Sequence, residues 1–257
     1  MNKLFIPISL ATVMFYATSA SAVSGQIQLG VMHANLSSGY SDWNDQNLRL
    51  NLQLPTGDQF NAEISPQQHF DDRGTFYGVG YSHGFNDDWY GSLQLGSSSG
   101  GFFLPSFRAD AFINRKWLSE RQLITTLGLG HYQAKDDYRD RSLLLGATYY
   151  LPMPLIAEVG MRFNSSAPGA VLSNRQFGVL SYGKPMDYYL TLRHESGDEA
   201  YQLIGPSAVI SAFSSRETSV SWRQWLTRSF GWTLQLNHYN NPNYSRNGQQ
   251  VGLFYEF

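Results

Sequence analysis

The feature that most constrains this chain is a strict alternation of apolar and polar residues with a period of two. It is clearest in NLRLNLQL, residues 47–54, where four leucines alternate with Asn47, Arg49, Asn51 and Gln53 before Pro55 ends the run. Successive side chains of a β-strand point to opposite faces, so the leucines share one face and the polar residues share the other. A strand of this kind needs an apolar environment on one side and a polar one on the other.

The same alternation recurs along the chain and gives fourteen candidate strands. Besides 47–54, clear runs lie at 26–31, 60–65, 107–114, 155–163, 188–193, 218–222, 232–236 and 251–257, and weaker runs lie near 75–83, 89–97, 122–131, 141–151 and 175–182. We therefore predict an all-β fold of about 14 strands. The alternative is 12 strands, because the runs near 89–97 and 175–182 are weak.

The connections between the candidate strands alternate between short and long. Short turns such as 55–59, 85–89 and 152–154 are followed by longer polar stretches such as 66–74 and 196–208. Outer-membrane barrels have this arrangement, with short periplasmic turns and longer extracellular loops. The pattern predicts a transmembrane up-and-down antiparallel β-barrel.

The N-terminal 22 residues have the features of a secretory signal peptide. Lys3 precedes an apolar run, and small residues at 20–22 suit cleavage after Ala22. The run is shorter than the ~20 residues that a transmembrane helix needs. We predict that residues 1–22 are a signal peptide and residues 23–257 the barrel. The chain has no cysteine, which excludes disulfides and zinc–thiolate sites, and its net charge of −2 argues against nucleic-acid binding.

A soluble sandwich or lipocalin-like barrel would also alternate apolar and polar residues. Aromatic residues beside the short turns favour the membrane: Trp89, Tyr90, Trp117, Tyr149, Tyr150, Tyr188, Tyr189, Trp225, Phe230 and Trp232. Such rings form a girdle at the membrane interface. We therefore expect the bacterial outer membrane as the location, with the leucines of 47–54 facing lipid.

The last strand gives a further indication of an outer-membrane protein. Val251, Leu253, Tyr255 and Phe257 share one face, and the chain ends on the aromatic residue. This resembles the C-terminal strand that the barrel assembly machinery recognises. The expected partners are therefore outer-membrane lipid, lipopolysaccharide and, through residues Val251 to Phe257, that machinery.

The mature chain resembles the YaiO family of outer-membrane β-barrel proteins. The resemblance rests on the leader ending ATSASA, the first strand SGQIQLGVMHANLSSGYSDWND, the segment YGVGYSHGF at 77–85 and the closing VGLFYEF. It implies an outer-membrane location and an association with surface polysaccharide production or export, with polysaccharide as a partner. It carries no active site, so no residue role is transferred from it.

The strand phases predict a lumen wall with equal numbers of positive and negative side chains. The predicted lumen-lining charged residues are Arg49, Glu63, Arg108, Asp110, Glu158, Arg162, Arg193, Glu195, Glu217 and Arg223. Either they line a selective pore, or they pair with one another and fill the interior. About eight strands give a filled barrel and 16–18 an aqueous channel, so 14 strands predict a narrow lumen at most.

No motif indicates catalysis, a metal site or a cofactor. None of the six histidines lies in a nucleophile or metal-ligand spacing, and we expect no enzymatic activity. Aromatic residues in the predicted loops, notably Trp43 and Tyr244, are candidate glycan contacts. The expected function is a narrow channel or accessory barrel in envelope transport related to surface polysaccharide. The alternatives are a non-conducting surface barrel that binds glycan or organises partners and, third, an outer-membrane enzyme.

Overall fold

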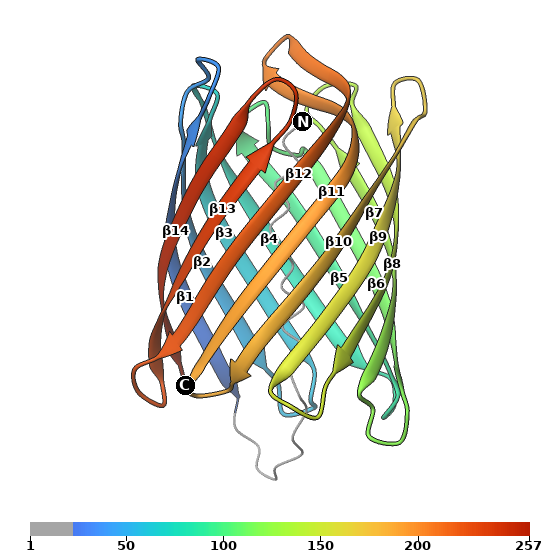
Figure 1. Cartoon of the computed structure of the whole chain (residues 1–257), viewed down its shortest axis with the longest axis vertical. Helices are drawn as coiled ribbons and strands as arrows, with labels where there is room; N and C mark the ends of the chain where they lie inside the picture. Colours follow the sequence, from blue (N-terminus) through green and yellow to red (C-terminus); the bar gives the residue numbers. More distant parts are fainter. Residues whose placement is uncertain (1–22) are drawn as a thin grey trace.

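A computed structural model describes residues 23–257, and these form one closed antiparallel β-barrel of fourteen strands (Figure 1). Each strand pairs with its neighbours in sequence, and β1 pairs with β14 to close the barrel. The strands are β1 Ser24–Leu36, β2 Trp43–Gln53, β3 Gln59–His69, β4 Asp72–Gly84, β5 Trp89–Gly100, β6 Phe107–Trp117, β7 Leu123–Gln133, β8 Arg139–Tyr150, β9 Leu155–Ala167, β10 Val171–Lys184, β11 Tyr188–Gly205, β12 Ala208–Trp225, β13 Phe230–Asn240 and β14 Ser245–Glu256.

The strand number of 14 is confirmed over the alternative of 12, because the two weak runs are the regular strands β5 and β10. The predicted signal peptide, residues 1–22, lies outside the described residues. Within residues 23–257, no helix is long and apolar enough to cross a membrane.

The alternation seen in the sequence separates the two faces of the wall. In β2, Asn47 is 8 % exposed whereas Leu48 is 42 % exposed. Leu48 pairs laterally with Leu29 of β1 and Ile64 of β3, so apolar residues on adjacent strands form a continuous outer band. These apolar side chains are exposed on the outer face of the barrel, as expected for a surface that contacts lipid. A closed barrel leaves no unpaired strand edge, which is what allows a sheet to cross hydrocarbon.

The two ends of the barrel differ. The turn end carries the connections 54–58, 85–88, 118–122, 151–154, 185–187 and 226–229, together with the C-terminus (Figure 1). The loop end carries 37–42, 70–71, 101–106, 134–138, 168–170, 206–207 and 241–244. By the arrangement typical of outer-membrane barrels, we assign the turn end to the periplasmic side and the loop end to the extracellular side.

Two of the long polar stretches predicted as loops are mostly strand. In 66–74 only residues 70–71 connect β3 to β4, and in 196–208 only residues 206–207 connect β11 to β12. Glu199 still pairs with Phe213, well above the end of the clear run at 188–193. The sequence turns polar there because the strands leave the lipid, while the backbone continues to pair. The β11–β12 hairpin therefore rises above the rim (Figure 1).

The predicted aromatic girdle at the turn end is only partly correct. Trp89, Trp117 and Tyr149 are exposed on the outer face, as a girdle requires. The neighbouring residues Tyr90, Tyr150, Tyr189 and Trp225 lie on the inward face of their strands. The alternation itself explains this difference, because adjacent aromatic residues on a strand cannot both face lipid.

Several inward phenylalanine rings lie flat over glycines of an adjacent strand. The ring of Phe177 on β10 packs against Gly160 of β9 so closely that a Cβ on Gly160 would lie 2.4 Å from the nearest ring atom. Phe254 has the same relation to Gly231, and Phe76 to Gly96. The missing side chain therefore makes room for a ring against the inner wall.

Gly160→Ala is expected to destabilise the barrel by about 1–3 kcal/mol, because the added methyl group displaces the Phe177 ring. Gly146, the cross-strand partner of Gly160, provides a matched control. A Cβ there would meet its nearest atom at 3.6 Å, so Gly146→Ala is expected to be neutral or stabilising. Urea unfolding of the two refolded variants in vesicles tests the difference. Equal unfolding midpoints would contradict the proposed packing.

Candidate functional site: the closed lumen

The ten charged residues predicted for the lumen lie on β2, β3, β6, β9, β11 and β12, on the face opposite the apolar band. Three salt bridges join members of this set: Arg49 Nη2 with Glu63 Oε1 at 3.2 Å, Arg108 Nε with Asp110 Oδ2 at 2.5 Å, and Arg193 Nη2 with Glu195 Oε2 at 2.8 Å. Their role in selectivity stays a prediction.

The remaining predicted residues have other partners than the sequence suggests. Arg223 Nη2 pairs with Glu256 Oε1 at 2.9 Å, and Glu217 Oε1 with Arg246 Nη2 at 3.1 Å. Both partners are on β14, so these pairs connect distant parts of the chain. Glu158 and Arg162, which are four apart on β9, form no salt bridge with each other among the described residues.

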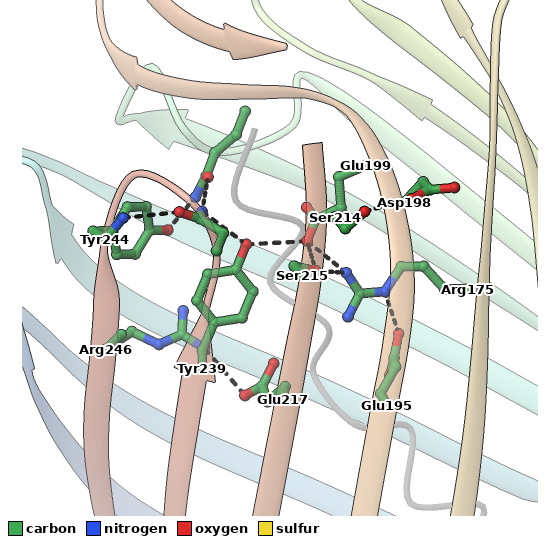
Figure 2. Close-up of polar contacts among 12 residues, drawn as sticks. Arg175, Glu195, Asp198, Glu199, Ser214, Ser215, Glu217, Tyr239, Tyr244 and Arg246 are labelled. Carbon is green, nitrogen blue, oxygen red and sulfur yellow. Dashed lines mark hydrogen bonds and ion pairs between the residues drawn. The ribbon is translucent and has the colours of Figure 1, made fainter. Parts of the chain in front are cut away.

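A buried polar cluster lies above these pairs, toward the loop end, and its centre is Arg175 of β10 (Figure 2). Arg175 is 2 % exposed. Its Nε donates to Glu195 Oε1 at 2.7 Å, and its Nη1 donates to Glu199 and to the hydroxyl of Ser215. Two carboxylates from β11 thus surround one guanidinium from β10, and the buried charges compensate one another.

The cluster continues along the wall toward β13 through uncharged groups (Figure 2). The hydroxyl of Tyr239 donates to Glu199 Oε1 at 3.1 Å, and Asn241 Nδ2 donates to the Tyr239 oxygen at 3.1 Å and to Gln202 Oε1 at 3.2 Å. Gln202 in turn donates to the hydroxyl of Tyr244. These contacts tie the β11–β12 hairpin to the end of β13 and its connection to β14.

A second buried group contains His69, the last residue of β3, which is fully buried. Its Nε2 lies 2.8 Å from Asp45 Oδ1. Its ring stacks on Trp43, with centroids 4.0 Å apart, and on Phe103, with centroids 4.4 Å apart. The guanidinium of Arg246 lies 4.4 Å from the Trp43 ring centroid, a distance suited to a cation–π contact. Polar and aromatic contacts thus bring β2, β3, β14 and the 101–106 segment together.

An apolar layer covers the loop end of the lumen. Phe102, in the connection between β5 and β6, contacts three apolar clusters. One cluster contains Ala34 of β1 and Phe70 of the β3–β4 connection, and it also packs against Ile204 and Ile210 of the β11–β12 hairpin. Residues on nearly opposite sides of the barrel therefore meet over its mouth. In this conformation the loop end is closed. We call the Arg175 cluster, the His69 group and this apolar layer together the closure.

The structure contradicts the prediction that Trp43 and Tyr244 are exposed loop contacts for glycan. Trp43 begins β2 and is 1 % exposed, and Tyr244 is 3 % exposed. Both belong to the closure, where neither ring offers a free face to a sugar. The polar residues around them suggest loops in the sequence, and Tyr244 does lie in the 241–244 connection, but both rings are packed inward against other aromatic residues.

The alternation in the sequence does not predict the polar cluster around Arg175. Arg175 lies in a weak run in which Phe177 and Val179 also point inward, so the alternation there does not assign a face. Glu199 and Gln202 lie in a stretch predicted as a loop.

Within 23–257 no three potential metal ligands come together.

Two histidines near the ends of the barrel have acidic neighbours. His83 Nδ1 lies 2.7 Å from Asp58 Oδ1 at the turn end, and His33 Nε2 lies 3.8 Å from Asp42 Oδ2 at the loop end. The hydroxyl of Tyr81 also donates to Asp58, and this hydrogen bond is the main reason that the pKa of Asp58 lies below its ordinary value. These contacts attach the 54–58 turn to β4.

Comparison with known proteins agrees with this geometry. The anion-selective porin from Comamonas acidovorans is similar over 93 % of this chain and 99 % of its own, with a TM-score of 0.53 at 9 % identity. The CymD monoaromatic hydrocarbon channel is similar over 93 % and 88 %, with a TM-score of 0.60 at 6 % identity. A bacterial polysaccharide outer membrane secretin is similar over 93 % and 100 %, with a TM-score of 0.56 at 8 % identity. At these identities the shared feature is the fold.

The protein is thus a fourteen-stranded β-barrel of the bacterial outer membrane, structurally like porins and channels. No curated protein matches it by sequence. The profile of the YaiO membrane beta barrel domain matches residues 24–202, and the chain belongs to this family. The matched range ends within β11, so β12, β13 and β14 complete the barrel beyond it.

Proposed function

We propose that this protein is a narrow outer-membrane channel that is closed in the present conformation and opens when its extracellular closure moves. The observation that carries the proposal is which segments contribute the residues that close the mouth of the barrel. Its apolar layer is completed by residues of the 101–106 connection and the β11–β12 hairpin, which lie at the rim of the barrel and pack against residues of the wall. No disulfide holds these segments, because the chain has no cysteine.

The wall below the closure suits polar solutes. The side chain of Arg49 is 29 % exposed and that of Arg193 is 22 % exposed, so their charges can meet an ion or solute. Amides such as Asn51 and Asn61 face the same interior and can both donate and accept hydrogen bonds. Surface polysaccharide is the cargo class that the family resemblance suggests. On this proposal the barrel transports and does not catalyse.

Shortening the hairpin tests the proposal. Replacing residues 200–212 by Asn-Gly removes Gln202, Leu203, Ile204 and Ile210 from the closure and leaves Glu199 and Phe213 to pair. We expect steady openings in planar bilayers that the full-length barrel lacks, because the mouth is then uncovered. In the open variant, Arg193→Ala and Glu158→Ala are expected to shift the reversal potential in a salt gradient toward cation and anion selectivity, respectively.

The matched control carries the same Asn-Gly replacement in the 226–229 turn at the opposite end of the barrel. This change leaves the closure intact, so its conductance should equal that of the full-length barrel. If the hairpin variant is folded, as judged by heat-modifiable mobility on gels, and remains silent, the channel proposal is wrong.

The depth of the closure favours a second candidate, a non-conducting barrel that binds glycan or organises envelope partners. Arg175 and Glu199 are almost completely buried, and the apolar layer adds to the barrier above them. A silent hairpin variant would favour this candidate, and binding of surface polysaccharide by the full-length barrel would then be the measurement that tests it.

A further inference from the structure

A groove of about 940 Å³ lies on the outer wall of the barrel, toward the loop end, over β14 and β1 to β5. Val31 and Val251, which are cross-strand partners, lie on its membrane side and are 54 % and 51 % exposed. They continue the apolar outer band. The groove therefore begins where the apolar band ends, which is where we expect the headgroups of the outer leaflet.

The groove coincides with an irregularity in the sheet. Pairing between β2 and β3 is interrupted between Asp45–Gln67 and Leu48–Ile64. Pro66 lies in this gap and has no N–H to donate. The hydroxyl of Ser65 donates instead to the carbonyl of Gln46 at 2.8 Å. Gln46 and Pro66 both line the groove, so its floor is a break in the regular ladder.

The outward side chains of the groove are mostly amides with two basic groups. They are His33, Asn44, Gln46, Gln68, Arg73 and Gln249. Amides can both donate to and accept from sugar hydroxyls. The planar guanidinium of Arg73 suits two oxygens of a phosphate. The lining therefore matches a phosphorylated sugar.

The guanidinium of Arg73 is exposed and available to an anion. Its Nε donates to Gln68 Oε1 at 3.2 Å, and it forms no salt bridge within the described part of the chain. Nearby carboxylates are turned elsewhere. Asp45 faces inward and contacts His69, and Asp72 accepts hydrogen bonds from the backbone N–H groups of Arg73 and Phe102.

Two acidic residues lie in the connections next to the groove, Asp42 in 37–42 and Asp71 in 70–71, and neither lines it. Asp42 accepts a hydrogen bond from Asn35 and lies 3.8 Å from His33 Nε2. Among the described residues, neither carboxylate forms a salt bridge with Arg73. This leaves the positive charge of Arg73 uncompensated on the groove side. An anionic headgroup is therefore the ligand whose charge complements the groove.

We propose that this groove binds the phosphorylated glucosamine headgroup of lipopolysaccharide. Arg73 binds a phosphate, the amides bind sugar hydroxyls, and the acyl chains run down the apolar band past Val31 and Val251. The occupant is a lipid because the groove opens directly above the part of the wall that faces hydrocarbon. This site is on the outer wall and does not depend on whether the lumen conducts.

The test measures binding of purified lipid A to the detergent-solubilised barrel by native mass spectrometry. Arg73→Gln is expected to weaken binding about tenfold or more, since a charged hydrogen-bonding partner is lost. Lipid A without phosphates should bind the unchanged barrel as weakly as intact lipid A binds Arg73→Gln. Gln46→Leu provides a second variant, in which sugar contacts are lost and the charge of the groove is kept.

Arg216→Gln is the matched control, because Arg216 is an exposed, outward arginine on β12, away from the groove. It should bind lipid A as the unchanged barrel does. The proposal is overturned if Arg73→Gln and Arg216→Gln bind equally, or if phosphatidylglycerol shows the same dependence on Arg73. It is also overturned if free glucosamine phosphate binds as tightly as lipid A, because the ligand would then be a soluble sugar phosphate.

Discussion

Replacing Arg175 by methionine is expected to lower the free energy of unfolding by about 3–5 kcal/mol, the cost of breaking a buried ion pair from one side. Glu199 is 6 % exposed and forms its salt bridge with Arg175, whereas Glu195 also pairs with Arg193. The variant therefore leaves the charge of Glu199 buried without a cation. Equilibrium urea unfolding in lipid vesicles measures the loss.

Two comparisons separate this effect from the loss of packing. Adding Glu199→Gln to Arg175→Met removes the uncompensated charge, so the double variant should be more stable than the single one. Arg49→Met breaks the Arg49–Glu63 bridge in a more exposed part of the wall, where we expect a cost below about 1 kcal/mol. Equal losses for the Arg175 and Arg49 variants would show that the buried cluster has no special role in stability.

Most of the fold was predictable because the two faces of a membrane barrel strand require different residue types, apolar toward lipid and polar toward the lumen. Lipid selects apolar residues at every second position, as in 47–54, and this pattern also identifies weaker strands such as β4 and β7. The ends of strands were less predictable. Above the membrane both faces of β11 and β12 are polar or mixed, so the period of two disappears although the strands continue as far as Gly205 and from Ala208.

The wall of the lumen was more predictable than its closure. A charged residue between two lipid-facing residues, such as Arg193 between Leu192 and His194, has only one face available to it. The closure depends on tertiary contacts instead. Trp43 stacks on His69 from the neighbouring strand, and Phe102 reaches clusters on both sides of the barrel. No local pattern distinguishes such inward aromatic residues from exposed loop aromatics.

Leu50→Arg is expected to destabilise the barrel by about 2–4 kcal/mol, the cost of a basic side chain near the middle of the lipid face. Leu50 pairs laterally with Ile27 of β1 and Ala62 of β3, within the apolar outer band. An arginine there must reach the headgroups or draw water into the hydrocarbon. The unfolding free energy in vesicles and the folded fraction on unheated gels both report the effect.

Asn51 is the matched control, because it is the next residue of β2 and faces the lumen. It pairs laterally with Gln26 and Asn61 and is exposed to the interior, so Asn51→Arg adds a charge in a polar, hydrated environment. Its stability should stay within about 1 kcal/mol of the unchanged barrel. The two substitutions differ by one position and introduce the same side chain. A larger loss for Asn51→Arg than for Leu50→Arg would therefore invert the assignment of lipid and lumen faces on which both the channel and the outer groove depend.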